Sequence, residues 1–156
     1  MKHNLVILAV LFLAFPAGAE AGDMEDIVAA IEKRWTDTAK KQINPGDSNP
    51  AGSWLATSQG GLWQFQSPAE AVAMITDSPN TLAFQPMHIN VQIMGSQKDV
   101  AYATYYLVGN IMIEGKPLVS NYRTRASTVY VKIGGKWLTS GEHYSPLYGG
   151  SGVVFD

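Results

Sequence analysis

The second half of the chain alternates apolar and polar side chains with a period of two, and this pattern most constrains the fold. Such alternation is typical of half-buried strands, because successive side chains point to opposite faces of a sheet. It predicts a strand over Met87–Met94, with Met87, Ile89, Val91 and Ile93 on one face. It predicts further strands over Val100–Val108, Asn110–Ile113, Val119–Ile133 and Lys136–Tyr144. Gly134-Gly135 predicts a two-residue turn, and therefore an antiparallel hairpin, between the last two.

The first half of the chain predicts helices instead. A helix is expected over Asp23–Lys41, with acidic residues in its first turn and lysines in its last, as the helix dipole favours. Its buried stripe is Ile27, Ile31, Trp35 and Thr38. Ser67-Pro68-Ala69-Glu70 has the form of a capping box that opens a short helix ending near Thr76. Helices followed by an antiparallel meander predict an α+β fold.

The segment from 44 to 67 is rich in Gly, Pro, Ser and Asn, yet it carries several large apolar side chains. Trp54, Trp63 and Phe65 lie within it. Disordered linkers contain few aromatic residues, so we expect a packed loop or lid. Neither a repeat nor a composition shift divides the chain after residue 21, which predicts a single domain over residues 22–156.

The amino end has the pattern of a cleavable secretory signal. Lys2 gives a charged start, Leu5–Phe15 has no polar side chain, and small residues follow. Cleavage after Ala19 or after Ala21 satisfies the small-residue rule, so residues 1–21 are expected to be a signal peptide. The apolar run is far shorter than the roughly 20 residues of a membrane span. We therefore expect an exported protein, periplasmic or secreted, that does not stay in the membrane.

Composition narrows the possible chemistry. With no cysteine, disulfides, thiol catalysis and a lipidated cysteine are excluded. Lys and Arg number 11 against 13 Asp and Glu, so the chain lacks the basic excess that nucleic-acid binding needs. His88 and His143 follow no metal-ligand spacing, and Gly109–Lys116 departs from a phosphate loop. Neither a metal nor another cofactor is expected.

Several segments together resemble one family. Gly95–Tyr106 resembles a strand of that family, Gly115-Lys116 its turn, and Arg125–Lys132 the strand after it. Gly135-Lys136-Trp137 followed by Glu142-His143-Tyr144-Ser145 looks like the ending of SnoaL-like proteins in the nuclear transport factor 2-like superfamily. The resemblance implies a cone, in which a curved antiparallel sheet wraps around the amino-terminal helices. It also implies an internal pocket and frequent dimerisation through the outer face of the sheet.

The resemblance leaves function open, because relatives include ketosteroid isomerases, polyketide cyclases, dehydratases and the association domain of calcium/calmodulin-dependent kinase II. We expect a ligand-binding homodimer, not a catalyst, that takes a small, mostly apolar molecule with or without a carboxylate. One alternative is a cofactor-independent isomerase, dehydratase or cyclase, with His143 as acid or base and Tyr105 or Arg125 polarising a carbonyl. Another is a dimeric assembly module that uses the outer sheet face and Val153-Val154-Phe155.

Five residues are candidates for the pocket. They are Trp35, Trp63, Tyr105, Arg125 and His143. The alternative for His143 is a purely structural histidine. A regular hairpin at Gly134-Gly135 places Ala126 opposite His143 and Arg125 opposite Tyr144, and therefore Arg125 and His143 on opposite faces. A bulge, which Gly141 would tolerate, can bring both into one pocket.

Overall fold

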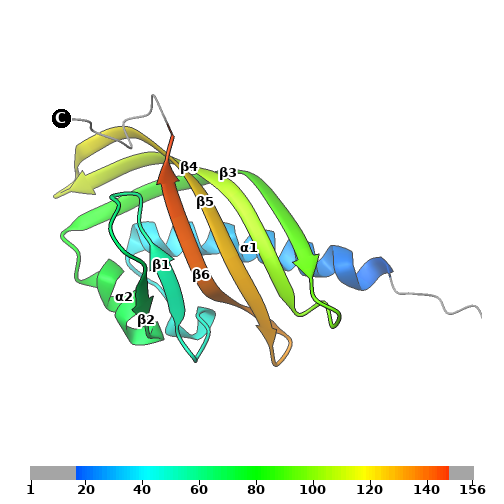
Figure 1. Ribbon diagram of the computed structural model, residues 1–156. Coiled ribbons are helices and arrows are strands. Elements are labelled where there is room, and N and C mark those ends of the chain that lie inside the picture. Colours follow the sequence, from blue (N-terminus) through cyan, green and yellow to red (C-terminus); the bar gives the residue numbers. More distant parts are fainter. Residues whose placement is uncertain (1–16, 148–156) are drawn as a thin grey trace, which may run out of the picture.

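The computed structural model describes residues 17–147, as two helices, a short 3₁₀ turn and six strands (Figure 1). The elements are α1 (Ala17–Lys40), η1 (Pro45–Asp47), β1 (Ser53–Ala56), β2 (Gln64–Gln66), α2 (Pro68–Thr76), β3 (Asn80–Met94), β4 (Val100–Ile113), β5 (Lys116–Ile133) and β6 (Lys136–Pro146). The predicted signal segment up to Pro16 and the predicted association tail Val153–Phe155 lie outside the described residues. Within residues 17–147, neither helix has the length and hydropathy that a membrane crossing requires.

The six strands form one curved sheet in the order β2-β1-β6-β5-β4-β3, and α1 runs along one of its faces (Figure 1). The α+β prediction is confirmed. The sheet is not purely antiparallel, however, because β1 runs parallel to β6. Beside that pair, the backbone N–H of Asn49 donates to the carbonyl of Thr139 at 2.8 Å. The segment predicted as a packed loop or lid therefore contains β1 and β2, the two strands at one edge of the sheet.

The core lies between α1 and the inner face of the sheet. The predicted stripe is confirmed, since Ile27, Ile31, Trp35 and Thr38 are all buried. Complete burial of one isoleucine side chain contributes about 1.5–3 kcal/mol. Opposite the helix, β4 and β5 present small alanines beside larger apolar side chains. The sheet side of the core includes Ile93, Ala101, Ala103, Leu107 and Ala126.

Strand β3 begins at Asn80, earlier than predicted, and contains a bulge. The pairing with β4 shifts between Met87 and Asn90, and His88 has a φ of 53°. Met87 therefore faces the opposite side from Ile89 and is 42% exposed. The predicted placement of Met87 with Ile89 on one face is wrong, because one extra residue reverses the alternation.

A second bulge lies in the β5–β6 hairpin. The two-residue turn is confirmed by the pairs Ile133↔Lys136 and Lys132↔Trp137. The register then shifts, because Val129 faces Gly141 while Tyr130 faces Thr139, which leaves Ser140 as an extra residue. Beyond this point Ser127 faces His143 and Arg125 faces Ser145. The regular pairing predicted for this hairpin is therefore wrong past the bulge, and Arg125 and His143 share one face.

The capping box of α2 is confirmed. The Ser67 hydroxyl accepts from the backbone N–H of Glu70, and the Glu70 carboxylate accepts from the backbone N–H of Ser67. This reciprocal pair satisfies N–H groups that the first turn of a helix leaves without partners. Helix α2 then lies beside the β1–β2 end of the sheet (Figure 1).

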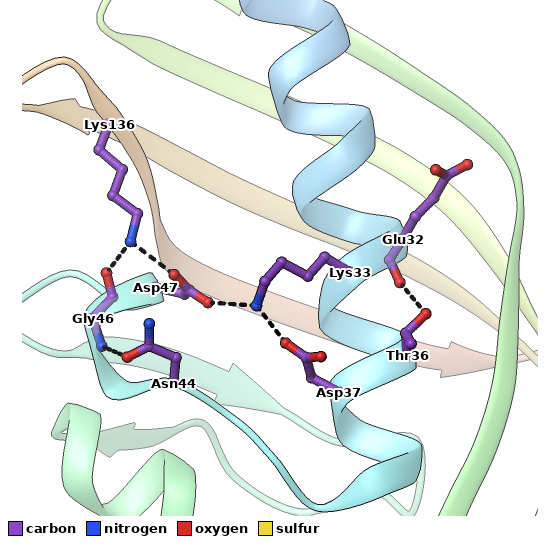
Figure 2. A network of polar contacts seen from close by, with 8 residues as sticks. All are labelled: Glu32, Lys33, Thr36, Asp37, Asn44, Gly46, Asp47 and Lys136. Atoms are coloured by element: carbon purple, nitrogen blue, oxygen red, sulfur yellow. Dashed lines mark hydrogen bonds and ion pairs between the residues drawn. The ribbon is translucent and has the colours of Figure 1, made fainter.

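A surface network of charges holds the segment before β1 against α1. Figure 2 shows Lys136 donating to the carbonyl of Gly46 at 2.7 Å and to the carboxylate of Asp47 at 2.8 Å. Lys33 lies 3.6 Å from the same carboxylate and also pairs with Asp37, one turn along α1. Exposed pairs of this kind contribute little stability each. Their effect is to position η1, and therefore the entry to β1.

Candidate functional site

The two helices, the β1–β2 connection and the inner face of the sheet border a cavity of about 270 Å³. This is near the lower end of the range for small-molecule sites. Its apolar and aromatic lining includes Trp35, Leu55, Met74, Ile75, Leu82, Phe84, Leu107, Ile111, Tyr122 and Tyr144. Its polar lining includes Arg34, Thr38, Thr57, Ser58, Gln59, Ser78, Asn80, Thr124 and Glu142. A cavity lined by aromatic and aliphatic side chains together with polar groups is typical of a ligand pocket.

A buried ion pair lies in the wall of the cavity. Arg34 of α1 donates from Nη2 to Oε2 of Glu142 on β6 at 2.9 Å. The side chains are 13% and 2% exposed, respectively. The hydroxyl of Tyr144 donates to the other carboxylate oxygen, Oε1, at 2.8 Å. Both oxygens of Glu142 therefore have a donor.

The surroundings keep Arg34 charged and Tyr144 neutral. Burial alone would lower the pKa of Arg34, but the carboxylate of Glu142 holds that pKa above its usual value. Burial raises the pKa of Tyr144 well above its usual range, and the charge of Glu142 raises it further. Tyr144 is therefore a hydrogen-bond donor at neutral pH. An ionised pair with a neutral phenol beside it carries no net charge.

A second polar group lies deeper, between α1 and β4–β5. The hydroxyl of Tyr105 is 3.2 Å from that of Thr128, and Trp35 donates to it from Nε1 at 3.4 Å. Burial is the main cause that raises the pKa of Tyr105, and likewise that of Tyr130. Both phenols stay protonated near neutrality, so they can only donate or accept hydrogen bonds there.

Aromatic rings form a continuous wall beside the ion pair. Trp35 meets Tyr144 edge to face at a centroid distance of 5.9 Å and lies 5.6 Å from Phe84. Phe84 in turn stacks on Tyr122 at 5.0 Å and 21° between the planes. Aromatic pairs in these geometries contribute about 0.5–1.5 kcal/mol beyond area burial. The wall therefore has a fixed shape against which a flat ligand can pack.

The connection between β1 and β2 lies over this cavity. Thr57, Ser58 and Gln59 line it, and the Ser58 hydroxyl contacts the hydroxyl of Tyr122. Gly60 and Gly61 follow, with φ values of 83° and 100°, a conformation that L side chains rarely adopt. The contact with Tyr122 and the turn at the two glycines place this connection in the wall of the cavity.

The structure divides the five predicted site residues between the two faces of the sheet. Trp35 lines the cavity, and Tyr105 is buried close beneath it. Arg125 and His143 instead lie on the outer face, where Trp63 packs against the imidazole of His143 at a ring distance of 5.7 Å. His143 therefore shares a face with Arg125 and lies on the opposite face from Tyr105.

The two charged residues of the cavity wall, Arg34 and Glu142, were not among the predicted site residues. Arg34 carries a signal, since it lies seven residues after Ile27 and three after Ile31, on the buried stripe of the helix. A charge on such a stripe needs a buried partner. Nothing local identifies Glu142 as that partner, because it lies 108 residues away. Between residues 17 and 147, no three His, Asp or Glu side chains are grouped closely enough to hold a metal ion.

Comparison with solved structures gives the fold. An NTF2-like protein with a cystatin-like fold from Novosphingobium aromaticivorans aligns over 88% of this chain and 93% of its own, with a TM-score of 0.65 and 14% identity. A proposed dehydratase of the NTF2-like family from Streptomyces avermitilis aligns over 81% and 97%, with a TM-score of 0.62 and 20% identity. The association domain of the Caenorhabditis elegans calcium/calmodulin-dependent kinase II aligns over 81% and 98%, with a TM-score of 0.61 and 16% identity.

These similarities confirm the expected fold, and the chain has the NTF2-like, cystatin-like architecture. No protein-family model matches the sequence, and no curated protein matches it either. Since the aligned proteins differ in what their names describe, the shared fold does not decide between binding, catalysis and assembly.

The ion pair leads to a prediction about stability. We expect Arg34→Met or Glu142→Leu alone to destabilise the protein by about 3–5 kcal/mol, because each leaves one buried charge without its partner. The double variant should lose much less than the sum of the two. Urea unfolding of the four proteins measures the coupling energy.

The exposed pair of Lys33 and Asp37 on the same helix is the matched control. Lys33→Met and Asp37→Leu should couple by about 0.5 kcal/mol or less, as exposed helical pairs do. Equal coupling energies for the two pairs would contradict the role given to Arg34 and Glu142.

Proposed function

We propose that the protein binds a small, neutral, mostly apolar molecule in the cavity between the helices and the inner face of the sheet. The observation that carries this proposal is the bonded set of Arg34, Glu142 and Tyr144 in a wall whose surface is mainly apolar and aromatic. Buried polar groups in such a wall orient a ligand, whereas the apolar part supplies affinity. No chemical step is assigned to these groups.

The charge of the cavity favours a neutral ligand over an anion. The positive charge of Arg34 is already offset by Glu142 at 2.9 Å. A ligand carboxylate next to Arg34 would also lie near Glu142, and like charges repel strongly at low dielectric. A guanidinium has five N–H donors, so Arg34 can still donate to the oxygen of a ketone, amide or ester. A carbonyl compound with flat apolar groups therefore matches the site best.

Catalysis is the weaker alternative for this chain. One aligned protein is described as a dehydratase, but its name alone transfers no mechanism at 20% identity. The predicted acid or base, His143, lies on the opposite face from the cavity, and both oxygens of Glu142 already accept hydrogen bonds. A ligand-binding role requires neither group to be available for proton transfer.

A pair of probes tests the ligand class. We expect 2-acetonaphthone to bind at least about tenfold more tightly than 2-naphthoate, since one charge-assisted hydrogen bond contributes about 1.5–3 kcal/mol without added repulsion. Binding is followed on the indole N–H resonance of Trp35, one of only four tryptophans. In Glu142→Gln the preference should reverse, because Arg34 then lacks a compensating charge.

Glu32→Gln, an exposed change on α1, is the control and should leave both affinities unchanged. A Trp35 resonance that responds to neither probe, or a Glu142→Gln variant that keeps the original preference, would argue against a neutral ligand in this cavity. Thermal unfolding of each variant shows that the fold is retained.

We also propose that the chain forms a homodimer through the β1–β2 corner of the outer sheet face. Trp54, Leu62 and Phe65 are exposed there by 52%, 88% and 56%, and Trp54 and Phe65 meet edge to face at 5.3 Å. Clustered exposed apolar side chains of this size are typical of interaction sites. Three of the aligned proteins are named as association domains, which supports a second copy as the occupant.

Sedimentation equilibrium tests the dimer. Trp54→Thr with Leu62→Ser should weaken self-association by at least about tenfold, since buried aromatic anchors dominate such interfaces. Leu118→Ser with Ile133→Thr removes apolar groups that are 57% and 46% exposed near the two ends of β5, and this double variant should change self-association little. A wild-type chain that stays monomeric at high concentration, or equal weakening by both doubles, would rule out this interface.

Export is the third part of the proposal. Asp23 lies just after the proposed cleavage positions and ties the start of α1 to the sheet. Its carboxylate forms a salt bridge with Lys132 at 2.5 Å and accepts a hydrogen bond from Nε1 of Trp137 at 3.2 Å. Cleavage after Ala19 or Ala21 would therefore spare these contacts.

Intact mass of the exported protein tests this proposal. The mature chain should begin at Glu20 or Gly22, and Leu8→Arg with Leu11→Arg should retain the precursor inside the cell, because charges disrupt the apolar segment of a signal. Asn4→Ser is the neutral control. An uncleaved chain in the periplasm or medium would overturn the cleavage proposal.

A further inference from the structure

A second hollow lies on the outer face of the sheet, away from the cavity. It has a volume of about 520 Å³ and spans four strands, β3 to β6. Its lining includes Asn90, Thr104, Tyr106, Arg125, Ser127 and His143. It shares no lining residue with the cavity.

Strand pairing fixes how these side chains are arranged. Asn90, Thr104, Ser127 and His143 lie opposite one another in turn and form one polar row across the sheet. Directly opposite side chains in a sheet have Cβ atoms about 4.5–5.5 Å apart. The row is therefore a continuous trough of short polar side chains.

The neighbouring row supplies a cation and a ring. Tyr106 lies opposite Arg125, and Arg125 lies opposite Ser145. Arg125 and His143 are diagonal neighbours, a separation of about 7–8 Å that long side chains can bridge. Both are on this face because of the extra residue Ser140 in β6. The hollow thus brings together one guanidinium, two imidazoles and several hydroxyls.

The chemistry of the hollow is that of an anion site. None of the described residues that line it is acidic. Within residues 17–147, the hydrogen bond that Arg125 makes is long, from Nη2 to the carbonyl of Pro146 at 3.5 Å. A guanidinium has five donors in a fork that matches the two oxygens of a carboxylate. Arg125 can therefore bind a carboxylate with little loss of existing contacts.

Flat rings border the same hollow. His88 meets Tyr106 edge to face at 6.1 Å, and Trp63 lies 5.7 Å from His143 at the other end of the polar row. Tyr102 and Tyr106 are 39% and 40% exposed. Exposed aromatic faces next to a cation favour a ligand that has its own ring beside its charge.

We propose that this outer hollow is a second ligand site, which binds a small aromatic carboxylate through Arg125 and His143. The carboxylate lies on the fork of Arg125 and accepts from the hydroxyls of the trough. The ring lies against Tyr106, and the indole of Trp63 reports the site through its packing on His143. This site is chemically opposite to the cavity, where Glu142 offsets the cation and a neutral ligand is favoured.

Benzoate is the test probe, with benzamide as its neutral isostere, titrated into the full chain. We expect benzoate to shift the indole N–H resonance of Trp63 and not that of Trp35, and to bind at least about tenfold more tightly than benzamide. Arg125→Gln should weaken benzoate binding by about tenfold or more, and His143→Gln by less. Glu142→Gln should leave the Trp63 response to benzoate unchanged, which separates this site from the cavity.

Arg123→Gln is the matched control. Arg123 is an exposed arginine two residues away on the same strand face, but it is bonded to Asn121 at 3.1 Å and does not line the hollow. Arg123→Gln removes the same charge from outside the hollow, so it should change benzoate affinity less than twofold if binding depends on direct contact with Arg125. Equal weakening by Arg123→Gln and Arg125→Gln would overturn the proposal, as would equal binding of benzamide. A response confined to Trp35 would assign benzoate to the cavity instead.

Discussion

The ion pair between Arg34 and Glu142 connects α1 to β6 in the middle of the sheet, and the polar groups of the interior are arranged around it. Each charge would be too costly to bury alone. With both oxygens of Glu142 bonded, by Arg34 and by Tyr144, the pair can lie beside Trp35 without unmatched polar atoms. Among the described residues, no buried side-chain polar atom lacks a partner. The cavity wall therefore combines a fully bonded ion pair with aromatic and aliphatic side chains.

One extra residue in β6 decides which chemistry each face of the sheet receives. Ser140 shifts the pairing, so that Glu142 and Tyr144 face inward while His143 faces outward beside Arg125. In a regular strand, His143 would pair with Ala126 instead of Ser127 and would lie on the opposite face from Arg125. Because of the bulge, a neutral interior and a basic, acid-free outer hollow lie back to back across a single sheet. The two hollows therefore suit ligands of different charge.

Local features of the fold were predictable from the sequence, and long-range ones were not. The capping box of α2, the stripe of α1 and the turn at Gly134-Gly135 depend on residues close in the chain. The parallel pairing of β1 with β6 joins residues almost ninety positions apart, and no local pattern specifies it. The bulge in β6 was also not predictable, because a glycine such as Gly141 permits a bulge without requiring one.

The candidate site follows the same division. Trp35 and Tyr105 were predicted from their aromatic character and do lie at or beneath the cavity. Arg125 and His143 were predicted for one pocket only if a bulge was present, and the bulge brings them together on the outer face. Arg34 was overlooked although its spacing from Ile31 places it on the buried stripe. A charged residue at such a position is a signal that sequence reading can use.

The pairing of β1 with the final strand also has a kinetic consequence. The attachment of β1 to the rest of the sheet, the partner of Arg34 and part of the cavity wall all require residues near 142 in β6. Contacts of such large sequence separation form slowly, because the entropy cost of closing the loop comes before the favourable energy of the contacts. During synthesis from the amino end, the cavity and the β1–β6 pairing therefore form only after β6 has been synthesised.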